Sequence, residues 1–383
     1  MTLADKIFSI AKKNLRPSAF FKAGFYLFIL LNSRLIIGQV KPFFKSPDGY
    51  ELIATDLHIH TVFSDGSVWP DIRVSEAIRE GLDLISITDH LEYQPHKSDI
   101  PHPDRNRSFE IANTAATKKP LSVIRGAEIT RSMPPGHINA VFVQDVNKLL
   151  FPDDPSAGII EANKQNAFVF WNHPNWARQR PDGIAKLDPL HEELIGKGLI
   201  HGIEVANETI FSDEAITIAL ENNLTILGTS DIHGIADWKF KIPEGGHRPI
   251  TFVLSEKNES KHVKEALFEG KTIVWFKDLM IGKEENLLKL LKANISVSSI
   301  TYEKNEIIGK IILKNLSANP LNLKYTGTYT FHEDGSVFII PPYKEKILQV
   351  KTLSRKKSLA LPFEVLNAIV GAKRHLNLTL VSD

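Results

Sequence analysis

The chain contains no cysteine among its 383 residues. This absence excludes disulfide bonds and thiolate zinc sites, and it is compatible with either a cytoplasmic or an exported protein. An excess of charge is also lacking, since 46 basic residues balance 45 acidic ones. Without an overall basic field, the composition argues against nucleic acid as the partner, although it does not exclude it, and favours a small ligand.

A long apolar run is missing as well. The apolar segment 23–31 is short for a membrane span, and Arg34 follows it closely. Several basic residues precede this segment, as in the n-region and h-region of a secretory signal. We therefore expect residues 1–38 to be a signal peptide that exports the protein to the periplasm or the exterior. An uncleaved membrane anchor and a packed helix of a cytoplasmic protein are the alternatives.

The most informative stretch runs from Asp56 to Gly66 and reads DLHIHTVFSDG. His58 and His60 are two residues apart, and on a strand such side chains point to the same face, where they can hold one metal ion together. One such pair is weak support by itself. The argument depends on the same placement recurring further along the chain.

Further histidines and acidic residues lie at the ends of short apolar runs that are typical of buried strands. They are His90 after residues 84–89, Glu128 at the end of 123–128, His137 before 138–143, His173 after 167–172, and Asp231 and His233 after 224–229. Segments with helical spacing and end signals separate these runs. The predicted helices span 70–81, 155–166, 189–198, 213–223 and 260–270. This alternation predicts parallel βα units, whose strand ends meet at one face when they close into a barrel.

In this order, the motifs resemble those of the PHP (polymerase and histidinol phosphatase) superfamily of metal-dependent phosphoesterases. They are His-x-His with a trailing Ser-Asp-Gly, Thr-Asp-His, Gly-x-Glu, a lone Gly-His, Asn-His-Pro and Ser-Asp-x-His, spread over roughly residues 49–277. The resemblance implies an α/β fold, a distorted (β/α)7 TIM-like barrel, with a trinuclear metal centre. The Ser-Asp-Gly form looks more like the nucleotide-directed branch than the histidinol-phosphate branch.

The resemblance also implies a ligand set. One ion would be held by His58, His60, Glu128 and Asp231, a second by Glu128, His137 and His173, and a third by Asp65, His90 and His233. A hydroxide bridging two ions would be the nucleophile, with Asp231, His233 and Glu128 as the catalytic residues. Two to three divalent ions are expected, and mixed imidazole and carboxylate ligands suit zinc, manganese or iron without choosing among them.

Some of these residues have simpler interpretations. His137 could be a solvated loop residue, and Asp65 could cap the turn at Gly66. We expect Asp89 to orient a ligand rather than to bind metal. Glu204 could orient a ligand or the substrate, or it could be a hydrogen-bonded carboxylate of the barrel.

Phosphate recognition usually needs fixed cations, because an arginine guanidinium matches phosphate oxygens with two N–H donors. Arg178 and Arg248 lie on predicted loops and are the expected substrate contacts. The alternative is that these arginines only keep the surface soluble. Trp171, Trp176 and Tyr93 could offer a stacking face to a base or sugar, or they could simply pack.

The chain length predicts two domains, the barrel over residues 49–288 and a smaller domain over residues 290–383. Residues 284–293 are predicted to form a connecting helix. Short strands are then expected at 295–298, 306–313, 321–330, 346–352 and 376–381. With turn residues between them, they predict a small immunoglobulin-like β-sandwich. It could pack on the barrel, or bind a partner or a glycan.

The sequence therefore predicts a metal-dependent phosphoesterase, a phosphatase similar to histidinol phosphatases, that acts on a small phosphorylated metabolite or nucleotide. A membrane would be contacted only through the N-terminal segment. One alternative is a phosphodiesterase or nuclease of the same family, which would need an open groove. Another is a catalytically idle metal-binding or adaptor barrel whose β-sandwich is the binding module, although the complete set of nine residues argues against it.

Overall fold

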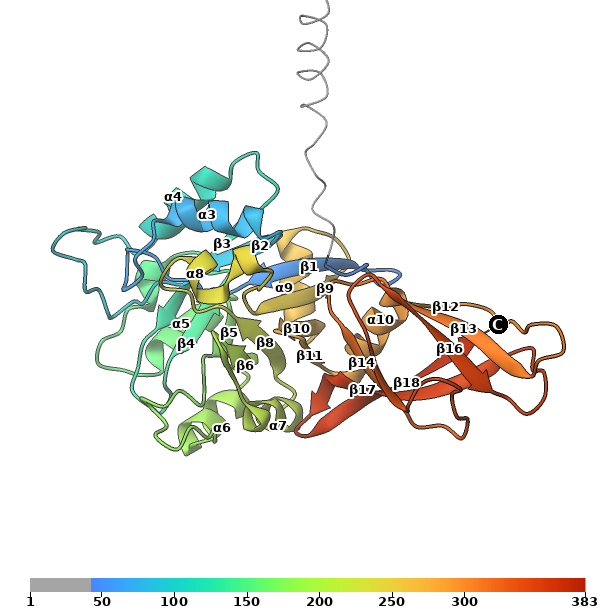
Figure 1. The fold of residues 1–383 in the computed structure, drawn as a ribbon. Helices are drawn as coiled ribbons and strands as arrows, with labels where there is room; N and C mark the ends of the chain where they lie inside the picture. Colours follow the sequence, from blue (N-terminus) through green and yellow to red (C-terminus); the bar gives the residue numbers. More distant parts are fainter. Residues whose placement is uncertain (1–42, 383) are drawn as a thin grey trace, which may run out of the picture. The chain divides into compact units, whose positions relative to one another are not determined.

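The computed structural model describes residues 43–382. The prediction of an N-terminal signal or anchor falls on residues outside this range. Within residues 43–382, no helix combines the length and apolar character that crossing a membrane requires. Figure 1 shows the α/β part of the chain in blue to yellow and the strands of the C-terminal part in orange to red.

The α/β part alternates strands and helices along most of its length. Its strands are β1 (Glu51–Asp56), β2 (Leu84–Ile87), β3 (Ser122–Ile129), β4 (Ile138–Val141), β5 (Phe168–Trp171), β6 (Gly202–Asn207), β7 (Ile210–Phe211), β8 (Thr225–Thr229), β9 (Ile250–Ser255), β10 (Thr272–Phe276) and β11 (Leu279–Gly282). Its helices are α3 (Pro70–Arg79), α4 (Arg107–Ala116), α5 (Ala157–Lys164), α6 (Pro189–Gly196), α7 (Asp213–Glu221), α8 (Ala236–Phe240), α9 (Ser260–Phe268) and α10 (Glu284–Asn294), with short 3-10 turns η1 (Val146–Leu149) and η2 (Ile242–Glu244).

The five helices predicted from end signals between the strands are confirmed as α3, α5, α6, α7 and α9. Each ends two residues before the predicted limit, because the glycine or asparagine there lies beyond the helix with a positive φ. The predicted connecting helix is present as α10. The prediction missed α4, whose start has no capping side chain, and the short helix α8.

Neighbouring strands form a nearly continuous circuit around the metal-ligand candidates. Strands β1, β2 and β3 are parallel, and so are β5, β6 and β8. The β1 and β8 ends then meet through a bridge between Ile59 and Ile232, where Asp231 N–H donates to His58 O at 2.9 Å. Because β1 and β8 are far apart in sequence, this contact brings two ligand-bearing segments together.

Strand β4 departs from the predicted parallel arrangement, because it pairs antiparallel with both β3 and β5. The start of an antiparallel strand lies at the same edge as the ends of its parallel neighbours. His137 directly precedes β4 and so reaches the same face as His90 and His173. Strands β9 and β10 add further antiparallel pairs beside β1.

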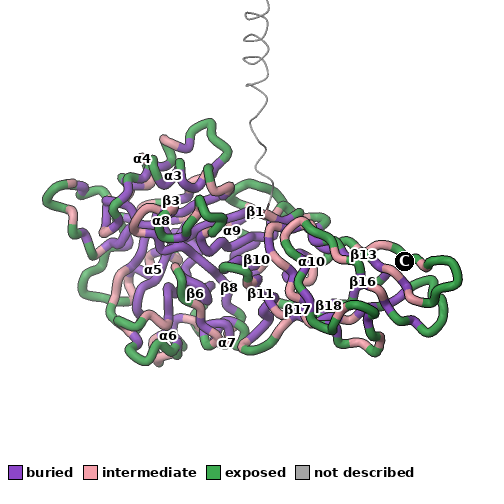
Figure 2. Tube along the Cα trace, in the orientation of Figure 1, coloured by how far each residue is buried: buried purple, intermediate pink, exposed green. Residues whose placement is uncertain are grey.

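The C-terminal part is a β-sandwich, as predicted. Its strands are β12 (Ile295–Val297), β13 (Ile308–Asn315), β14 (Leu321–Tyr325), β15 (Val337–Ile340), β16 (Glu345–Lys351), β17 (Leu359–Gly371) and β18 (Arg374–Ser382). One sheet has the order β15, β14, β17, β18 and the other β12, β13, β16. Buried residues alternate along these strands, which places an apolar interior between the sheets (Figure 2).

The two parts share a sheet edge and a hydrophobic core. Strand β17 pairs parallel with β11 of the α/β part. Asn367 also donates to Asp278 O at 2.8 Å, and the Trp275 indole N–H donates to Asn319 Oδ1 at 2.9 Å. The predicted boundary between residues 288 and 290 falls inside α10, which contacts strands of both parts. The α/β fold followed by a β-sandwich is confirmed, and the two parts are joined by backbone pairing.

Candidate metal centre

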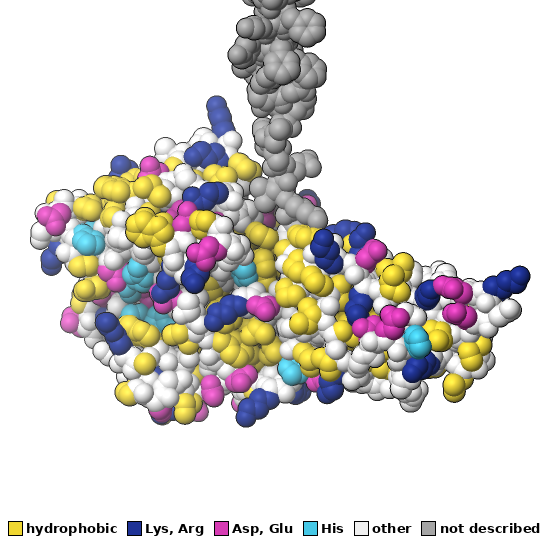
Figure 3. All heavy atoms as spheres, in the orientation of Figure 1, with side chains coloured by type: hydrophobic (Ala, Val, Ile, Leu, Met, Phe, Trp, Pro, Cys, Tyr) yellow, Lys and Arg dark blue, Asp and Glu magenta, His cyan; other side chains and the backbone are white. Residues whose placement is uncertain are grey.

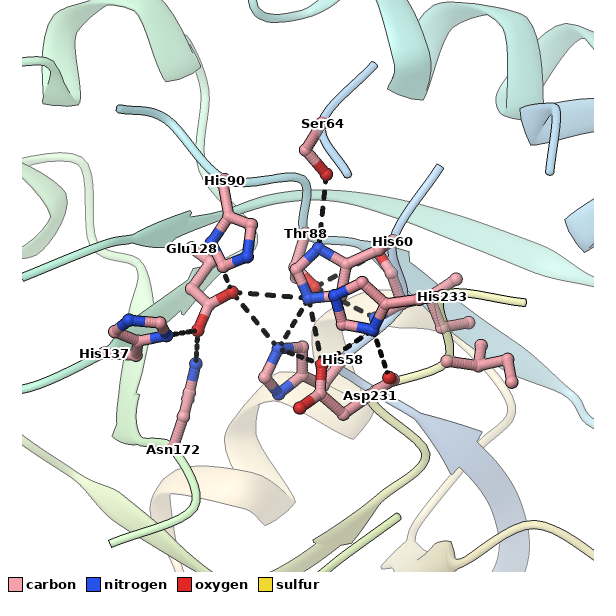
Figure 4. A network of polar contacts seen from close by, with 12 residues as sticks. His58, His60, Ser64, Thr88, His90, Glu128, His137, Asn172, Asp231 and His233 are labelled. Atoms are coloured by element: carbon pink, nitrogen blue, oxygen red, sulfur yellow. Dashed lines mark hydrogen bonds and ion pairs between the residues drawn. The ribbon is translucent and has the colours of Figure 1, made fainter. Parts of the chain in front are cut away.

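The nine predicted ligands come together at one face of the α/β part. Figure 4 shows seven of them, His58, His60, His90, Glu128, His137, Asp231 and His233. On the space-filling view, histidine side chains gather in a hollow of this face (Figure 3). Three overlapping groups have ligand atoms within 4.8 Å of one another. They are His60, Asp65, His90 and His233; His58, His60 and Asp231; and His90, Glu128 and His137. The structure therefore brings together residues that span most of the α/β sequence.

The tightest cluster comprises His58, His60, Asp231 and Glu128. The Nε2 atoms of the two histidines are 3.0 Å apart, and each lies 3.0–3.2 Å from Asp231 Oδ1. Glu128 Oε2 lies 3.5 Å from His58 Nε2 and 3.3 Å from His60 Nε2. Ligand atoms that bind one ion at about 2.0–2.2 Å lie roughly 3.0–3.5 Å from each other, so this spacing suits a single first-row divalent ion.

The Glu128 carboxylate joins this cluster to a second one. Its other oxygen, Oε1, lies 2.8 Å from His137 Nδ1 and 3.6 Å from His173 Nε2. His137 is therefore turned into the site, and the alternative of a solvated loop residue is wrong for this side chain. A carboxylate between two groups of imidazoles has the position of a ligand that bridges two ions.

Asp65 forms a third cluster on the more open side of the site. Its Oδ1 lies 3.2 Å from His233 Nε2 and 3.6 Å from His90 Nε2. Among the nine side chains, Asp65 and His233 are the most exposed, at 25% and 34%, and the other seven are at most 12% exposed. The site is thus accessible chiefly past these two residues.

Several buried ligand atoms make no well-aligned hydrogen bond and face only other ligand candidates. Asp65 Oδ1 lies 3.2 Å from His233 Nε2, Glu128 Oε2 lies 2.8 Å from His90 Nδ1, and His137 Nδ1 lies 2.8 Å from Glu128 Oε1. Buried charged groups are usually paired or bound to metal. Ligand atoms that face one another, with mixed nitrogen and oxygen donors, fit divalent cations of the zinc, manganese or iron type.

The carboxylates and imidazoles shift each other's proton affinities. Burial alone would raise the pKa of Glu128 and Asp231, but the surrounding histidines outweigh burial and hold both pKa values well below their usual range. Burial would lower the pKa of His58 and His90, but nearby carboxylates raise both, that of His90 to about 10. Without metal, protons on the histidines supply part of the positive charge that bound cations would otherwise provide.

Glu204 orients His58. Its Oε1 accepts from His58 Nδ1 at 2.8 Å, which leaves Nε2 free to face the centre, and its Oε2 accepts from His173 N–H at 2.7 Å. Such a carboxylate fixes the tautomer and orientation of a ligating histidine. The sequence left the role of Glu204 open, and the structure identifies it as an orienting residue.

Asp89 supports His60 indirectly, through Ser64. It accepts from the Ser64 hydroxyl at 2.7 Å, and Ser64 Oγ lies 3.3 Å from His60 Nδ1. It also accepts from the Thr61 N–H at 2.7 Å. The Asp89 side chain therefore holds the loop after β1, in agreement with the predicted orienting role.

Two supporting residues were missed by the sequence analysis. Asn172 donates to Glu128 Oε1 at 2.9 Å. Arg73, from α3, is almost fully buried and donates to His60 O, Ile232 O and His233 O at 2.8–3.0 Å. Arg73 thereby holds together the segments after β1 and β8 that carry ligand candidates. Nothing in its spacing distinguished it from an exposed helix arginine.

Backbone geometry at two ligands is unusual. His173 has a φ of 27° and Asp231 a φ of 47°, a region that residues other than glycine rarely occupy. Such conformations persist only where the surrounding structure imposes them, and they cluster at functional sites. Gly66 serves a related purpose, because a Cβ there would lie 2.8 Å from the carbonyl carbon of His60.

The prediction that Arg248 contacts the substrate is wrong. Its guanidinium is only 1% exposed, donates to both oxygens of Glu80 at 2.7 Å, and donates to Asp56 Oδ2 at 2.9 Å. Asp56 in turn accepts from the Ser230 backbone, next to Asp231. Arg248 had appeared to be a loop residue, but its neighbour β9 lies beside β1, which buries the side chain behind the site.

Arg178 remains a candidate substrate contact. Its side chain is exposed, and its guanidinium lies 5.7 Å from the centre of the Trp176 ring. Trp176 lies against His137 and His173, with ring centres 5.4 and 5.2 Å apart. Tyr93 packs edge to face against His90. A cation and two aromatic rings thus border the centre.

Comparison with known proteins agrees with this architecture. Residues 295–381 match the DUF5001 family model, an Ig-like domain. No curated protein matches the chain. A solved two-domain protein from Bacteroides vulgatus, described as containing a predicted PHP-like metal-dependent phosphoesterase, is 37% identical, with a TM-score of 0.84 over 90% of this chain and 99% of that one.

Two other solved structures are less similar. One is a candidate metal-dependent phosphoesterase from Bifidobacterium adolescentis, 18% identical, with a TM-score of 0.37 over 50% of this chain and 90% of that one. The other is an amidohydrolase from Chromobacterium violaceum, 16% identical, with a TM-score of 0.36 over 48% of this chain and 88% of that one. At these TM-scores, neither supports an argument about this chain.

Replacing His58 and His60 together with alanine should remove bound metal. Their Nε2 atoms are two of the four donors in the tightest cluster, so we expect the loss of at least one ion per chain, measured by mass spectrometry of metal content. The exposed His332→Ala variant is the control and should retain all metal. Unchanged metal content in the double variant would contradict the ligand assignment.

Metal loading should release protons, and metal affinity should fall as pH falls. The pKa of His58 is raised well above its usual value and that of His90 to about 10, so both carry protons near neutral pH, and a cation must displace these protons to bind. Calorimetric titration in buffers of different ionisation enthalpy counts the released protons. An affinity that stays constant between about pH 6 and pH 8 would contradict this expectation.

Arg248→Met should destabilise the fold by about 3–5 kcal/mol, because it leaves Asp56 and Glu80 buried without a counter-charge. Denaturant unfolding measures this change. The control is Arg107→Met, since Arg107 is exposed and pairs only with Glu110, and we expect it to change stability little. Wild-type stability combined with a raised KM in Arg248→Met would restore Arg248 as a substrate contact.

Proposed function

This chain belongs to the PHP superfamily of metal-dependent phosphoesterases, and we propose that it hydrolyses phosphoric monoesters of small molecules. The observation that carries the proposal is the convergence of His58, His60, Glu128 and Asp231, whose facing ligand atoms lie 3.0–3.5 Å apart in a buried site. We propose two to three divalent ions in the three clusters, with Glu128 between two of them.

Bound divalent ions would neutralise the charge on a phosphoryl group and activate a water molecule at neutral pH. The residues of the chain fix the geometry for this chemistry. Glu204 and Asp89 hold the imidazoles of His58 and His60 in one orientation, and Arg73 holds the loops that carry them. Asp231 and His233 lie on the accessible side, where His233 Nδ1 donates to Asp231 O at 2.8 Å and its Nε2 faces Asp65.

Arg178 is the proposed contact to the phosphate. It is an exposed guanidinium held over Trp176, which itself lies against two candidate ligands. Stacking leaves the N–H edge of a guanidinium free to donate, and this edge matches two phosphate oxygens. Tyr93 packs against His90 and is 51% exposed, so it can contact the organic part of an ester.

The narrow access to the site favours monoesters over diesters. Among the nine ligand candidates, only the side chains of Asp65 and His233 are more than 12% exposed. A terminal phosphoryl group can therefore reach the ions end-on, whereas a diester would need room on both sides. A phosphodiesterase activity is the second candidate. The even charge balance also favours a small substrate over a long nucleic acid.

We propose export for the complete chain, on the basis of the basic and apolar segments within residues 1–38. For the C-terminal sandwich, we propose a supporting role. Its strand β17 extends the sheet of the α/β part, and Asn319 and Asn367 hydrogen-bond across the junction. Binding of a partner or a glycan by the sandwich is the alternative.

The test is hydrolysis of a generic phosphomonoester and a generic phosphodiester by protein loaded with zinc, manganese or iron in turn, with metal content measured in parallel. We expect turnover of the monoester with two to three ions per chain. Faster turnover of the diester would favour the second candidate. Bound metal without hydrolysis of either ester would contradict both and favour an idle metal-binding protein.

Arg178→Met should lower kcat/KM for a phosphomonoester about tenfold to a hundredfold, the usual effect of losing a hydrogen bond to a charged group. Metal content should not change, because Arg178 touches no ligand atom. Steady-state kinetics measure the effect, and Arg107→Met, which alters an exposed arginine of α4, is the matched control. Equal kinetics in the two variants would remove Arg178 from the site.

A further inference from the structure

An apolar groove lies between the start of α3 and the helix α8. Its volume is about 350 Å³. We call it the tryptophan groove, and its walls are formed mainly by Val68, Trp69, Ile72, Gly234, Ile235 and Trp238. An ion pair between Arg79 and Asp237 lies at its edge.

The groove exposes an unusual amount of apolar side chain. Trp238 is 79% exposed, Trp69 45% and Ile72 47%. By contrast, Trp171 and Trp275 are buried. Clustered exposure of large apolar side chains marks binding surfaces, because such a patch is costly to leave in water. Two tryptophans on adjacent segments therefore point to a ligand.

The walls of the groove belong to the two segments, after β1 and after β8, that also carry the most exposed metal-ligand candidates. Asp65 and Trp69 belong to the loop after β1, and His233 and Trp238 follow β8. The two loops are tied together where the Ser67 N–H donates to His233 O at 2.9 Å. His233, Gly234 and Ile235 are partly exposed without interruption, and the last two of them line the groove. A molecule held at the centre can thus extend into the groove.

Hydrogen bonds from α3 hold the backbone of the second wall of the groove, after β8, in one shape. Arg73 donates to Gly234 O at 2.7 Å and to His233 O at 2.8 Å, and Glu76 accepts from the Ala236 N–H at 3.0 Å. These groups are buried and fully engaged. A groove that is held in one shape before binding loses little conformational entropy when it is filled.

We propose that the tryptophan groove binds the organic group of the phosphoester and that this group carries an aromatic ring. The assignment rests on the proposed function, because the phosphoryl end must lie at the centre for the ring to reach the groove. Indole rings supply large, stiff contact areas, and aromatic rings pack on them in offset or edge-to-face arrangements. The site thereby selects aromatic phosphomonoesters over small aliphatic ones.

The experiment compares 1-naphthyl phosphate with glycerol phosphate in Trp69→Ser, Trp238→Ser and the double variant. We expect kcat/KM for 1-naphthyl phosphate to fall about tenfold in each single variant and further in the double variant, mostly through KM. Glycerol phosphate turnover and metal content should stay unchanged. The control is Leu353→Ser, which removes an equally exposed side chain, 87% accessible, from the C-terminal part.

A second measurement does not depend on hydrolysis. Binding of 1-naphthol to the metal-free protein, followed by calorimetry, should be present in the wild type and lost in the double variant. If no ester is hydrolysed but this binding is lost in the double variant, the groove stands and the proposed function fails. If the double variant binds 1-naphthol normally and hydrolyses both esters as the wild type does, the groove assignment is overturned, and a role in contacting a protein or a membrane surface takes its place.

Discussion

The structure depends on a buried negative charge that needs positive partners. Glu128 is fully buried, and four imidazoles from three segments, those of His58, His60, His90 and His137, lie within 3.5 Å of its two oxygens. Taking a carboxylate out of water costs several kcal/mol unless cations or hydrogen bonds replace the water. Divalent ions bound at this site would meet this need and would supply the chemistry of the proposed phosphate ester hydrolysis. Strand geometry, loop conformation and supporting residues all serve to hold these side chains together around the same charge.

The residues that support the ligand candidates contribute as much to the geometry of the site as the ligand candidates themselves. Arg73 and Arg248 are both buried, yet neither faces a substrate, because each is used to fix backbone or carboxylates behind the centre. Arg73 holds the ends of the segments after β1 and β8, and Arg248 joins Asp56 to Glu80. Ligand atoms must be placed within a fraction of an ångström to share an ion, and outer hydrogen bonds provide that precision.

Much of the fold followed from local signals. Proline at the start and glycine past the end located α3 and α6 to within two residues, since these signals act on the backbone of the segment itself. The prediction missed α4 and the long strand β17, which lack such local signals. The antiparallel direction of β4 was also out of reach, because it depends on pairing with β3 and β5 and not on its own residues.

The sequence by itself indicated most of the candidate donors, because histidines and carboxylates placed after apolar runs reach one face when the strands are parallel. The resemblance to a known family completed the set. The sequence also determined the order of the two parts of the chain. Only the tertiary structure decided which polar residues face the site and which are enclosed behind it. Arg178 and Arg248 look alike in sequence, but one is exposed above Trp176 and the other is buried against Glu80. That difference arises from contacts between residues far apart in the chain, which spacing along the sequence does not encode.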